Sequence, residues 1–248
     1  DTARSYGRGE AFLASWLEAR GHRDVTVSSK WGYRYTAGWK TDAEVHEVKD
    51  HSLAHLNSQW AESRALLGDR LHVYQVHSAT LESGVLTDRA VLDRLTALAG
   101  EGVAVGLSVT GPRQADVIDA AMETGVFTWV QATWNVLETS AGAALARAKA
   151  RGAHTIAKEG MANGLLSSRG DLVEWKALAQ QHSVTPDALA LGVALQQPFL
   201  DVVLSGATTQ AQLTSNLRAR DVGPVTGWEA FAVPPARYWS ERSALKWT

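Results

Sequence analysis

Apolar residues recur along the chain at two alternating spacings. In residues 25–30, valine alternates with serine or threonine, a period of two that is typical of a strand with one buried face. In residues 87–100, Leu92, Leu95 and Leu98 lie three positions apart, which predicts a helix with one apolar face. The other strands predicted from these patterns are 71–77, 103–108, 128–132, 154–157 and 201–204, and the other helices are 44–67, 113–125, 141–152, 170–182, 185–197 and 209–220.

Strands and helices alternate along most of the chain, which predicts parallel βαβ units. Six complete strands are expected from Val25 onward, and Asp1 is expected at the end of a further strand whose body precedes the sequence. Because a (β/α)8 barrel takes about 250 residues, we expect an α/β fold: a TIM-type barrel that lacks its first strand, first helix and most of its second strand. Residues 1–221 would form this partial barrel, and residues 222–248 a tail that covers it or packs on it.

A doubly wound open sheet is the alternative architecture for alternating strands and helices. Such sheets normally carry a glycine-rich phosphate loop after an early strand, of the GxGxxG or GxxxxGK(S/T) kind. Neither motif occurs in this sequence, so the barrel is favoured. An upstream extension of about 40 to 50 residues, one βα unit and most of a strand, is expected to complete the stable and active form.

Composition excludes several classes of function. The chain has 248 residues, of which 45% are hydrophobic and 20% charged, with a net charge of -2 and no cysteine. Disulfides and cysteine-ligated zinc are therefore excluded, and a reducing, cytoplasmic location is expected. No block of Lys or Arg suggests nucleic acid or a membrane surface as a partner. The longest apolar runs are far shorter than the ~20 residues that cross a bilayer.

Four candidate catalytic residues fall where predicted strands end, which is where barrel enzymes place their chemistry. They are Asp1, Tyr6, Lys30 and His77. A free tyrosine has a pKa of roughly 10, and a nearby ammonium such as that of Lys30 stabilises tyrosinate and lowers this pKa. The Asp1 carboxylate would pair with Lys30, and the His77 imidazole would orient a substrate oxygen. Each residue alone has an ordinary structural explanation, but their order on successive strands is specific.

Three strings around these residues resemble the aldo-keto reductase family. DTARSYGRGE resembles the family signature, SSKWG its lysine strand and QVHS its histidine strand. The resemblance implies an oxidoreductase that reduces aldehydes or ketones, or oxidises the alcohols, with a nicotinamide cofactor. It implies Tyr6 as the general acid, tuned by Lys30 and Asp1, with His77 orienting the carbonyl. The implied partner is a small-molecule carbonyl or sugar-like substrate.

The same resemblance implies an extended cofactor across the barrel mouth without a Rossmann domain. The matching positions are Ser108 and Gln131 for the carboxamide, Lys158, Glu159 and Met161 along the nicotinamide ring and pyrophosphate, and Gly206, Thr208, Gln212 and Asn216 at the adenosine phosphate. Lys158 stands where many members carry a stacking aromatic residue, and Glu159 with Gly160 replaces a common Ser-Pro pair. No Lys or Arg occurs between Leu204 and Leu217. NADP is therefore the family default, and NAD is the alternative.

Aromatic residues and the tail leave two interpretations open. Aromatic side chains in loops after strands would either wall an apolar substrate pocket or close the top of the barrel; they are Trp31, Tyr33, Tyr35, Trp39 and Trp134. Four tail residues would either cover the barrel mouth or pack on its outside; they are Arg237, Tyr238, Trp239 and Arg242.

Two other functions compete with an oxidoreductase. The first is a cofactor-binding barrel without turnover, acting as a sensor or regulatory subunit. The second is a metal-dependent hydrolase that uses His72, His77 and an aspartate, which would need three or more ligands at strand ends. His46, His51 and His55 have near-helical spacing but are expected to face solvent. No metal site is therefore predicted.

Overall fold

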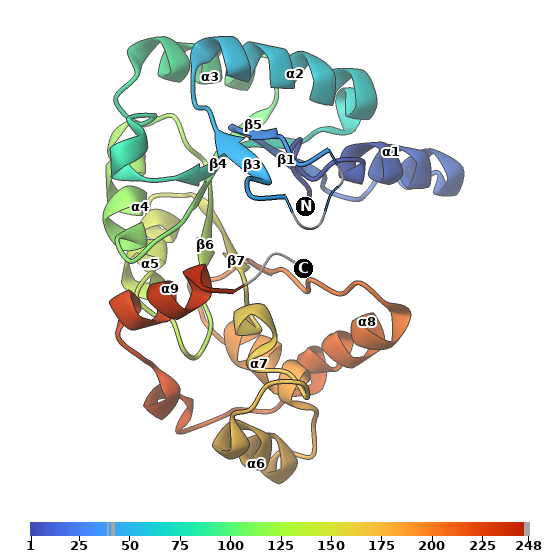
Figure 1. Cartoon of the computed structure of the whole chain (residues 1–248), viewed down its shortest axis with the longest axis vertical. Helices are drawn as coiled ribbons and strands as arrows, with labels where there is room; N and C mark the ends of the chain where they lie inside the picture. Colours follow the sequence, from blue (N-terminus) through green and yellow to red (C-terminus); the bar gives the residue numbers. More distant parts are fainter. Residues whose placement is uncertain (39, 41–42, 246–248) are drawn as a thin grey trace. The chain divides into compact units, whose positions relative to one another are not determined.

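The structure is a computed structural model that describes residues 1–38, 40 and 43–245. Trp39 and the last three residues of the predicted tail therefore lie outside the described residues. The described chain forms two compact units (Figure 1). The N-terminal unit comprises Asp1–Thr110 and Asp116–Val130, and the C-terminal unit comprises Gly111–Ala115 and 131–245.

Parallel strands form the central sheet, as the alternation of strands and helices predicts. Their order is β1-β4-β5-β6-β7-β8, which is also their order along the chain. The strands are β1 Ser28–Trp31, β4 Val73–Ala79, β5 Ala104–Val109, β6 Trp129–Thr133, β7 His154–Lys158 and β8 Val202–Val203. This order confirms the predicted α/β class and the six predicted strands. It is linear, so the described strands do not close into a complete barrel.

Helices follow the strands at most of the predicted places. They are α1 Gly9–Arg20, α2 Leu53–Leu67, α3 Arg89–Gly100, α4 Gln114–Glu123, α5 Gly142–Ala150, α6 Val173–Gln181, α7 Pro186–Leu195, α8 Gln210–Leu217 and α9 Pro235–Ser243. Short 3-10 helices are η1 Gly68–Arg70, η2 Leu81–Ser83, η3 Ala162–Gly164, η4 Arg218–Asp221 and η5 Trp228–Phe231. None of the described helices is long and apolar enough to cross a membrane.

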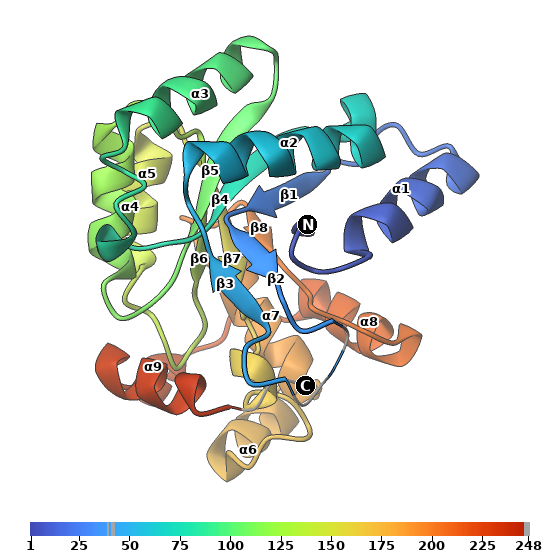
Figure 2. The ribbon, with the colours of Figure 1, turned by 45° about the horizontal axis from the view of Figure 1, so that its top comes forward.

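In the N-terminal unit, β4 pairs in parallel with β1 and β5. Lys30 of β1 lies opposite Gln75 of β4 in this register. Helices α2 and α3 lie beside each other on one side of these strands (Figure 2). The Asp88 side chain caps α3 by accepting hydrogen bonds from the backbone of Ala90 and Val91, which explains why the helix starts there.

The predicted helix over residues 44–67 is wrong in its first part. Residues Glu47–Lys49 form strand β3, which pairs antiparallel with β2, Tyr33–Tyr35. Helix α2 begins only at Leu53, because the Ser52 side chain accepts a hydrogen bond from the backbone N–H of His55 and caps the helix. The three histidines of this segment are half-buried rather than solvent-facing; they are His46, His51 and His55.

The C-terminal unit has its own apolar core, which includes part of the predicted tail. Tyr238 and Trp239 of α9 are buried in this core together with Trp175 and Val193. The tail sequence shows no clear helical period, so α9 was not predicted. The burial of its two aromatic side chains explains why it forms, since tertiary packing supplies most of the stability of a short helix.

Candidate active site

Asp1 and the buried Lys30 form an ion pair in the N-terminal unit. Lys30 lies on β1 and is 2% exposed, and its Nζ lies 2.5 Å from Oδ2 of Asp1. This Nζ also donates a hydrogen bond to the carbonyl oxygen of Thr2 at 3.0 Å. Oδ1 of Asp1 accepts hydrogen bonds from Ser28 Oγ at 2.7 Å and from Gln75 Nε2 at 3.3 Å. Both carboxylate oxygens therefore have donors, which fixes the carboxylate in one orientation.

Tyr6 and His77 lie next to this ion pair. The Tyr6 Oη lies 3.4 Å from Nε2 of His77, and the two rings meet edge to face. The Nζ of Lys30 lies 5.5 Å from the centre of the Tyr6 ring. Tyr6 is 49% exposed, whereas His77 is 8% exposed. The structure thus brings the four predicted catalytic residues together, with the phenol as the group most open to a substrate.

The charge state of Lys30 follows from its burial. Desolvation lowers the pKa of Lys30 to about 7. The Asp1 carboxylate at 2.5 Å favours the ammonium form. Lys30 therefore exchanges protons near neutral pH, where an ordinary tyrosine with a pKa of about 10 does not. In its charged form, it places a cation beside the Tyr6 ring.

A buried carboxylate anchors the loop that carries Tyr6. Glu10 of α1 is 0% exposed, and its Oε1 accepts hydrogen bonds from Ser29 Oγ at 2.5 Å and Ser63 Oγ at 2.7 Å. Its other oxygen pairs with Arg4, which also donates to the carbonyl oxygen of Gly7 at 3.0 Å. Sequence alone indicated Glu10 only as part of a helix start in the DTARSYGRGE string, because its partners lie far apart in the chain.

His51 supports the backbone of His77. Its Nε2 donates a hydrogen bond to the carbonyl oxygen of His77 at 2.9 Å, and its ring meets Trp31 edge to face. Burial lowers the pKa of His51 to about 4, so this imidazole is neutral at pH 7. Gly32 has a φ of +117°, and a Cβ there would lie 2.5 Å from the His51 ring, so only glycine fits.

The two residues predicted to hold a carboxamide lie in different units. In the N-terminal unit, Ser108 is 1% exposed, and its Oγ accepts a hydrogen bond from the backbone N–H of Ser78 at 2.9 Å. Ser78 has a φ of +53°, so this bond supports a left-handed turn just after His77. Gln131 of the C-terminal unit is 1% exposed. It lies within β6 rather than at its end, because the strand continues to Thr133.

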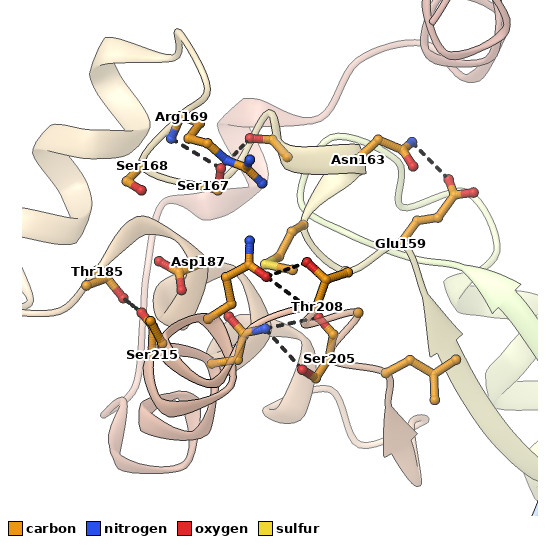
Figure 3. Close-up of a pocket in the computed structure, with 18 of the residues that line it drawn as sticks. Glu159, Asn163, Ser167, Ser168, Arg169, Thr185, Asp187, Ser205, Thr208 and Ser215 are labelled. Carbon is orange, nitrogen blue, oxygen red and sulfur yellow. Dashed lines mark hydrogen bonds between the residues drawn. The ribbon is translucent and has the colours of Figure 1, made fainter. Parts of the chain in front are cut away.

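A pocket of about 590 Å³ lies in the C-terminal unit, between the segment after β7 and the segment before α8 (Figure 3). Seven of the nine predicted cofactor-binding residues line it: Lys158, Glu159, Met161, Gly206, Thr208, Gln212 and Asn216. Asn216 is 5% exposed and donates to the carbonyl oxygen and Oγ of Ser205, which holds the segment before α8 against the helix. The cations Lys158 and Arg169 line the pocket together with the carboxylates of Glu159 and Asp187.

A charged cluster forms one end of this pocket. Arg242 of α9 donates to both carboxylate oxygens of Glu159, and Lys158 Nζ lies 3.7 Å from that carboxylate. Burial acts to raise the pKa of Glu159, but the charges of Lys158 and Arg242 and hydrogen bonds from Arg242 and Asn163 lower it to about 2. Lys158 Nζ also donates to Thr133 Oγ1 at 2.8 Å. The tail helix therefore lies at the carboxyl end of β7, beside the predicted cofactor residues.

Side chains of the same segment form hydrogen bonds with backbone N–H groups at the N-terminus of α8. The helix begins at Gln210 rather than within Gly206–Thr208, because Thr209 is its N-cap. Oε1 of Gln212 accepts hydrogen bonds from the backbone N–H groups of Thr208 and Thr209, and Gln212 N–H donates to Thr209 Oγ1. These bonds satisfy the N–H groups of Thr208, Thr209 and Gln212, which are therefore not available to an anion.

Comparison with known proteins identifies the family. The profile described as the aldo/keto reductase family matches residues 1–227. The chain belongs to this family. The holo form of aldo-keto reductase AKR11C1 from Bacillus halodurans has a TM-score of 0.74 at 22% identity, covering 98% of this chain and 81% of that one. Glycerol dehydrogenase AKR11B4 from Gluconobacter oxydans has a TM-score of 0.73 at 19% identity, covering 98% and 80%. Among curated proteins, none matches the chain.

Members of this family are NAD(P)H-dependent carbonyl reductases that act on small carbonyl compounds. The likeness to the two solved structures shows the barrel-type fold alone. Within the part of the chain that the structure describes, no three His, Asp or Glu residues are grouped so as to hold a metal ion. His72 of the hydrolase hypothesis instead accepts a hydrogen bond from the backbone N–H of Val27 through its Nδ1.

The aromatic residues suggested as pocket wall divide into two groups. Trp31 is 0% exposed and Trp134 is 1% exposed, so in this family member both are core side chains rather than an open wall. Tyr33 and Tyr35 lie on β2 and are half-buried. Tyr33 meets His77 edge to face at 4.9 Å between ring centres, which places it beside the candidate catalytic cluster.

Proposed function

We propose that this family member reduces aldehydes or ketones, or oxidises the corresponding alcohols, with Tyr6 as the general acid or base. The observation that carries the proposal is the grouping of Tyr6, His77 and the Asp1–Lys30 ion pair in one unit. The Tyr6 Oη at 3.4 Å from His77 Nε2 leaves both groups able to approach one carbonyl oxygen. The substrate class proposed is a small carbonyl or sugar-like compound.

The chain's own residues have separate roles in this reaction. Tyr6 O–H donates a proton to the carbonyl oxygen as it becomes an alcohol oxygen. The His77 side chain directs that oxygen toward the phenol, and the Lys30 ammonium stabilises the tyrosinate that remains. Asp1 holds Lys30 in place through the 2.5 Å ion pair. A bound nicotinamide cofactor supplies the hydride for the carbonyl carbon.

The pocket of the C-terminal unit supports a nicotinamide dinucleotide as the cofactor. Its two cations, Lys158 and Arg169, suit phosphate groups. We propose Ser108 and Gln131 for the carboxamide and the seven pocket-lining residues for the remainder of the cofactor. NADP is the proposed cofactor, with NAD as the alternative. The absence of cysteine supports a reducing compartment, and the cytoplasm is the proposed location.

Exchange of Tyr6 for phenylalanine tests the proposal. The measurement is steady-state oxidation of NADPH and NADH with a panel of aldehydes, ketones and sugar-like carbonyls. Tyr6→Phe is expected to lower turnover by about 10² or more, the usual scale of general acid catalysis, and to leave cofactor affinity nearly unchanged. The control is Tyr74→Phe, which removes a buried phenol on β4 that packs on Trp60 outside the cluster.

Two outcomes contradict the proposal in different ways. Unchanged turnover in Tyr6→Phe would show that another group donates the proton. Cofactor binding by the unmodified protein without turnover of any carbonyl in the panel would instead favour a sensor or regulatory subunit.

A further inference from the structure

A second pocket, of about 640 Å³, lies in the N-terminal unit and is lined by the loop that carries Tyr6, by strand β2 and by α2 with the residues before it. Neither the proposed proton transfer nor the proposed cofactor site uses it. We propose that this N-terminal pocket binds an uncharged polyhydroxylated ligand, that is, a sugar or a polyol. The proposal adds a binding site to the proposed function.

Two arginines and two carboxylates line the N-terminal pocket, and they form ion pairs with each other. Arg34 lies 2.8 Å from Oδ2 of Asp50, and Nε of Arg4 lies 3.6 Å from Oε2 of Glu62. The formal charges of these four side chains cancel. An anionic ligand would therefore meet two carboxylates, and a cationic ligand would meet two guanidinium groups, so both would be repelled by part of the lining.

The same side chains offer both donors and acceptors to a ligand. A guanidinium has five N–H donors and no acceptor, whereas a carboxylate only accepts. A sugar hydroxyl can accept from the first and donate to the second, and such charge-assisted hydrogen bonds are stronger than neutral ones. The hydroxyl groups of Ser52 and Ser58 also line the pocket and can donate or accept. An apolar ligand would instead remove these groups from water without giving them partners, which costs free energy.

Buried hydrogen bonds hold the walls of the N-terminal pocket in place. Gln59 is 6% exposed, and it accepts from the backbone N–H of Gly32 at 2.9 Å and donates to the carbonyl oxygen of Tyr33 at 2.8 Å. These two bonds tie α2 to the start of β2. The side chain of Arg4 is 18% exposed and donates to the carbonyl oxygen of Gly7 at 3.0 Å. The polar groups are thus placed before a ligand arrives, which reduces the entropy lost on binding.

The N-terminal pocket adjoins the candidate proton donor along the chain. Ser5 and Gly7 both line it, and Tyr6 lies between them. The bound hydroxyl groups can therefore belong to the remote part of a sugar whose carbonyl reacts at Tyr6, or to a separate sugar molecule. The chemistry of recognition is the same for both sources.

Titrations of the isotope-labelled protein followed by NMR measure binding without depending on turnover. The uncharged probes are glucose and methyl glucoside, and the charged analogues are gluconate and glucosamine. The uncharged probes are expected to shift the backbone amide signals of Ser52 and Ser58, with a Kd on the order of 1 mM, because hydrogen bonds at exposed side chains compete with water. The charged analogues are expected to bind about threefold more weakly.

Variants of the lining test the assignment of the site. Arg34→Gln should weaken binding of both uncharged probes about tenfold, the loss of one hydrogen bond to a charged group, and the fold should tolerate it because this side chain is 63% exposed. Arg89→Gln is the matched control, because Arg89 is exposed, pairs with Asp93 at 2.9 Å in the same unit and does not line the pocket. Ser58→Leu fills the pocket from an exposed position of α2 and should abolish binding, while leucine favours the helix more than serine does.

Inhibition of glucose reduction by methyl glucoside distinguishes the two sources of hydroxyl groups, and this measurement rests on the proposed function. Competition with glucose that is weakened in Arg34→Gln would assign the N-terminal pocket to the substrate's own hydroxyl groups. Binding of methyl glucoside without competition would assign it to a separate sugar molecule.

Three results would overturn the proposal. They are absence of binding of the uncharged probes by the unmodified protein, tighter binding of either charged analogue than of glucose, and equal affinities in Arg34→Gln and Arg89→Gln. None of these results bears on the role of Tyr6. Conversely, absence of turnover with every carbonyl compound would contradict the proposed function, and the NMR titrations would still decide whether the pocket binds sugars.

Discussion

The candidate catalytic cluster and the candidate cofactor pocket differ in how they hold their charged side chains. In the N-terminal unit, Lys30 is 2% exposed and Glu10 is 0% exposed, and their charges are paired within the fold. In the C-terminal unit, Arg169 is exposed and its guanidinium has no protein partner among the described residues. Buried pairs fix geometry because breaking them is costly, whereas exposed charges change at little cost. The charged groups of the first region are therefore fixed in one geometry, whereas Arg169 can be exchanged at little cost in stability.

The two regions also differ in the elements that hold them. The ion pair spans β1 and the segment before α1, and β1 is paired along its whole length with β4. The pocket is lined largely by loops, and two of its non-glycine residues have positive φ angles, Glu159 at +56° and Asn163 at +53°. Left-handed conformations in non-glycine residues cluster where the surrounding structure imposes them, often at binding sites.

The largest expected effect follows from removing the buried cation. Lys30→Met takes away the ammonium beside Tyr6 and should lower turnover by about 10² or more, since a tyrosine with a higher pKa is a weaker acid. The alkaline limb of the pH profile for carbonyl reduction should move to higher pH, because Tyr6 keeps its proton longer. The measurement is kcat against pH. Lys40→Met, at an exposed lysine of the same unit, is the control.

An unchanged pH profile of kcat in Lys30→Met would contradict this prediction, because the buried ammonium would then not influence the pKa of Tyr6. A loss of turnover with an unchanged profile would reduce Lys30 to a structural ion pair with Asp1. Cofactor affinity, measured by titration, should remain within about twofold in either case, because Lys30 lies in the N-terminal unit and not among the residues that line the pocket.

Local sequence signals predicted much of the fold. The Thr-Pro-Asp string predicted the start of α7, where Thr185 accepts a hydrogen bond from the backbone N–H of Ala188. The alternation in residues 25–30 predicted a strand, and the structure assigns β1 to Ser28–Trp31. These signals act within a few residues, so they are visible in the sequence. Strand β3 was missed because Glu47–Lys49 is short and polar and is stabilised by pairing with distant Tyr33–Tyr35.

The residues of the candidate site also differ in whether the sequence alone could reveal them. Asp1, Tyr6, Lys30 and His77 could be found from a family signature, and the structure groups them. Glu10 could not be assigned a role from sequence, because its partners Ser29 and Ser63 lie 19 and 53 residues away. Arg169 gives no sequence signal either, since an exposed arginine in a loop is ordinary until the pocket around it is known.

Glu10→Gln should have the next largest effect, and on stability rather than on the proton donor. Loss of this carboxylate leaves Arg4 without its buried partner, and breaking a buried pair costs about 3 kcal/mol in free energy of unfolding. Urea denaturation measures the change. Glu62→Gln is the control, because Glu62 lies 3.6 Å from the same Arg4 but is 55% exposed, so its removal should cost less than about 1 kcal/mol. Equal losses of unfolding free energy in the two variants would show that the buried and the exposed partner of Arg4 contribute alike to stability.

The smallest expected effect lies at the edge of the pocket. Arg242→Gln removes the cation that donates to both oxygens of Glu159. Arg242 is 35% exposed, so solvent screening reduces the expected loss in free energy of unfolding to about 1 kcal/mol at neutral pH. The pKa of Glu159 is lowered to about 2 in the folded protein, so its contribution is present above its ordinary value of 4.5 and is lost as the pH falls toward 2.

The difference in stability between the unmodified protein and Arg242→Gln should therefore shrink as the pH is lowered from 5 toward 2. Arg237→Gln is the control on the same helix, because Arg237 pairs with Glu241 in an exposed i,i+4 contact and should show no measurable change at any pH. A difference that stays constant with pH would mean that Arg242 stabilises α9 by packing on Trp239, whose ring centre lies 5.3 Å away, rather than by its charge. In that case, packing rather than charge would hold the edge of the pocket, and the contrast between the two regions would apply only to Arg169.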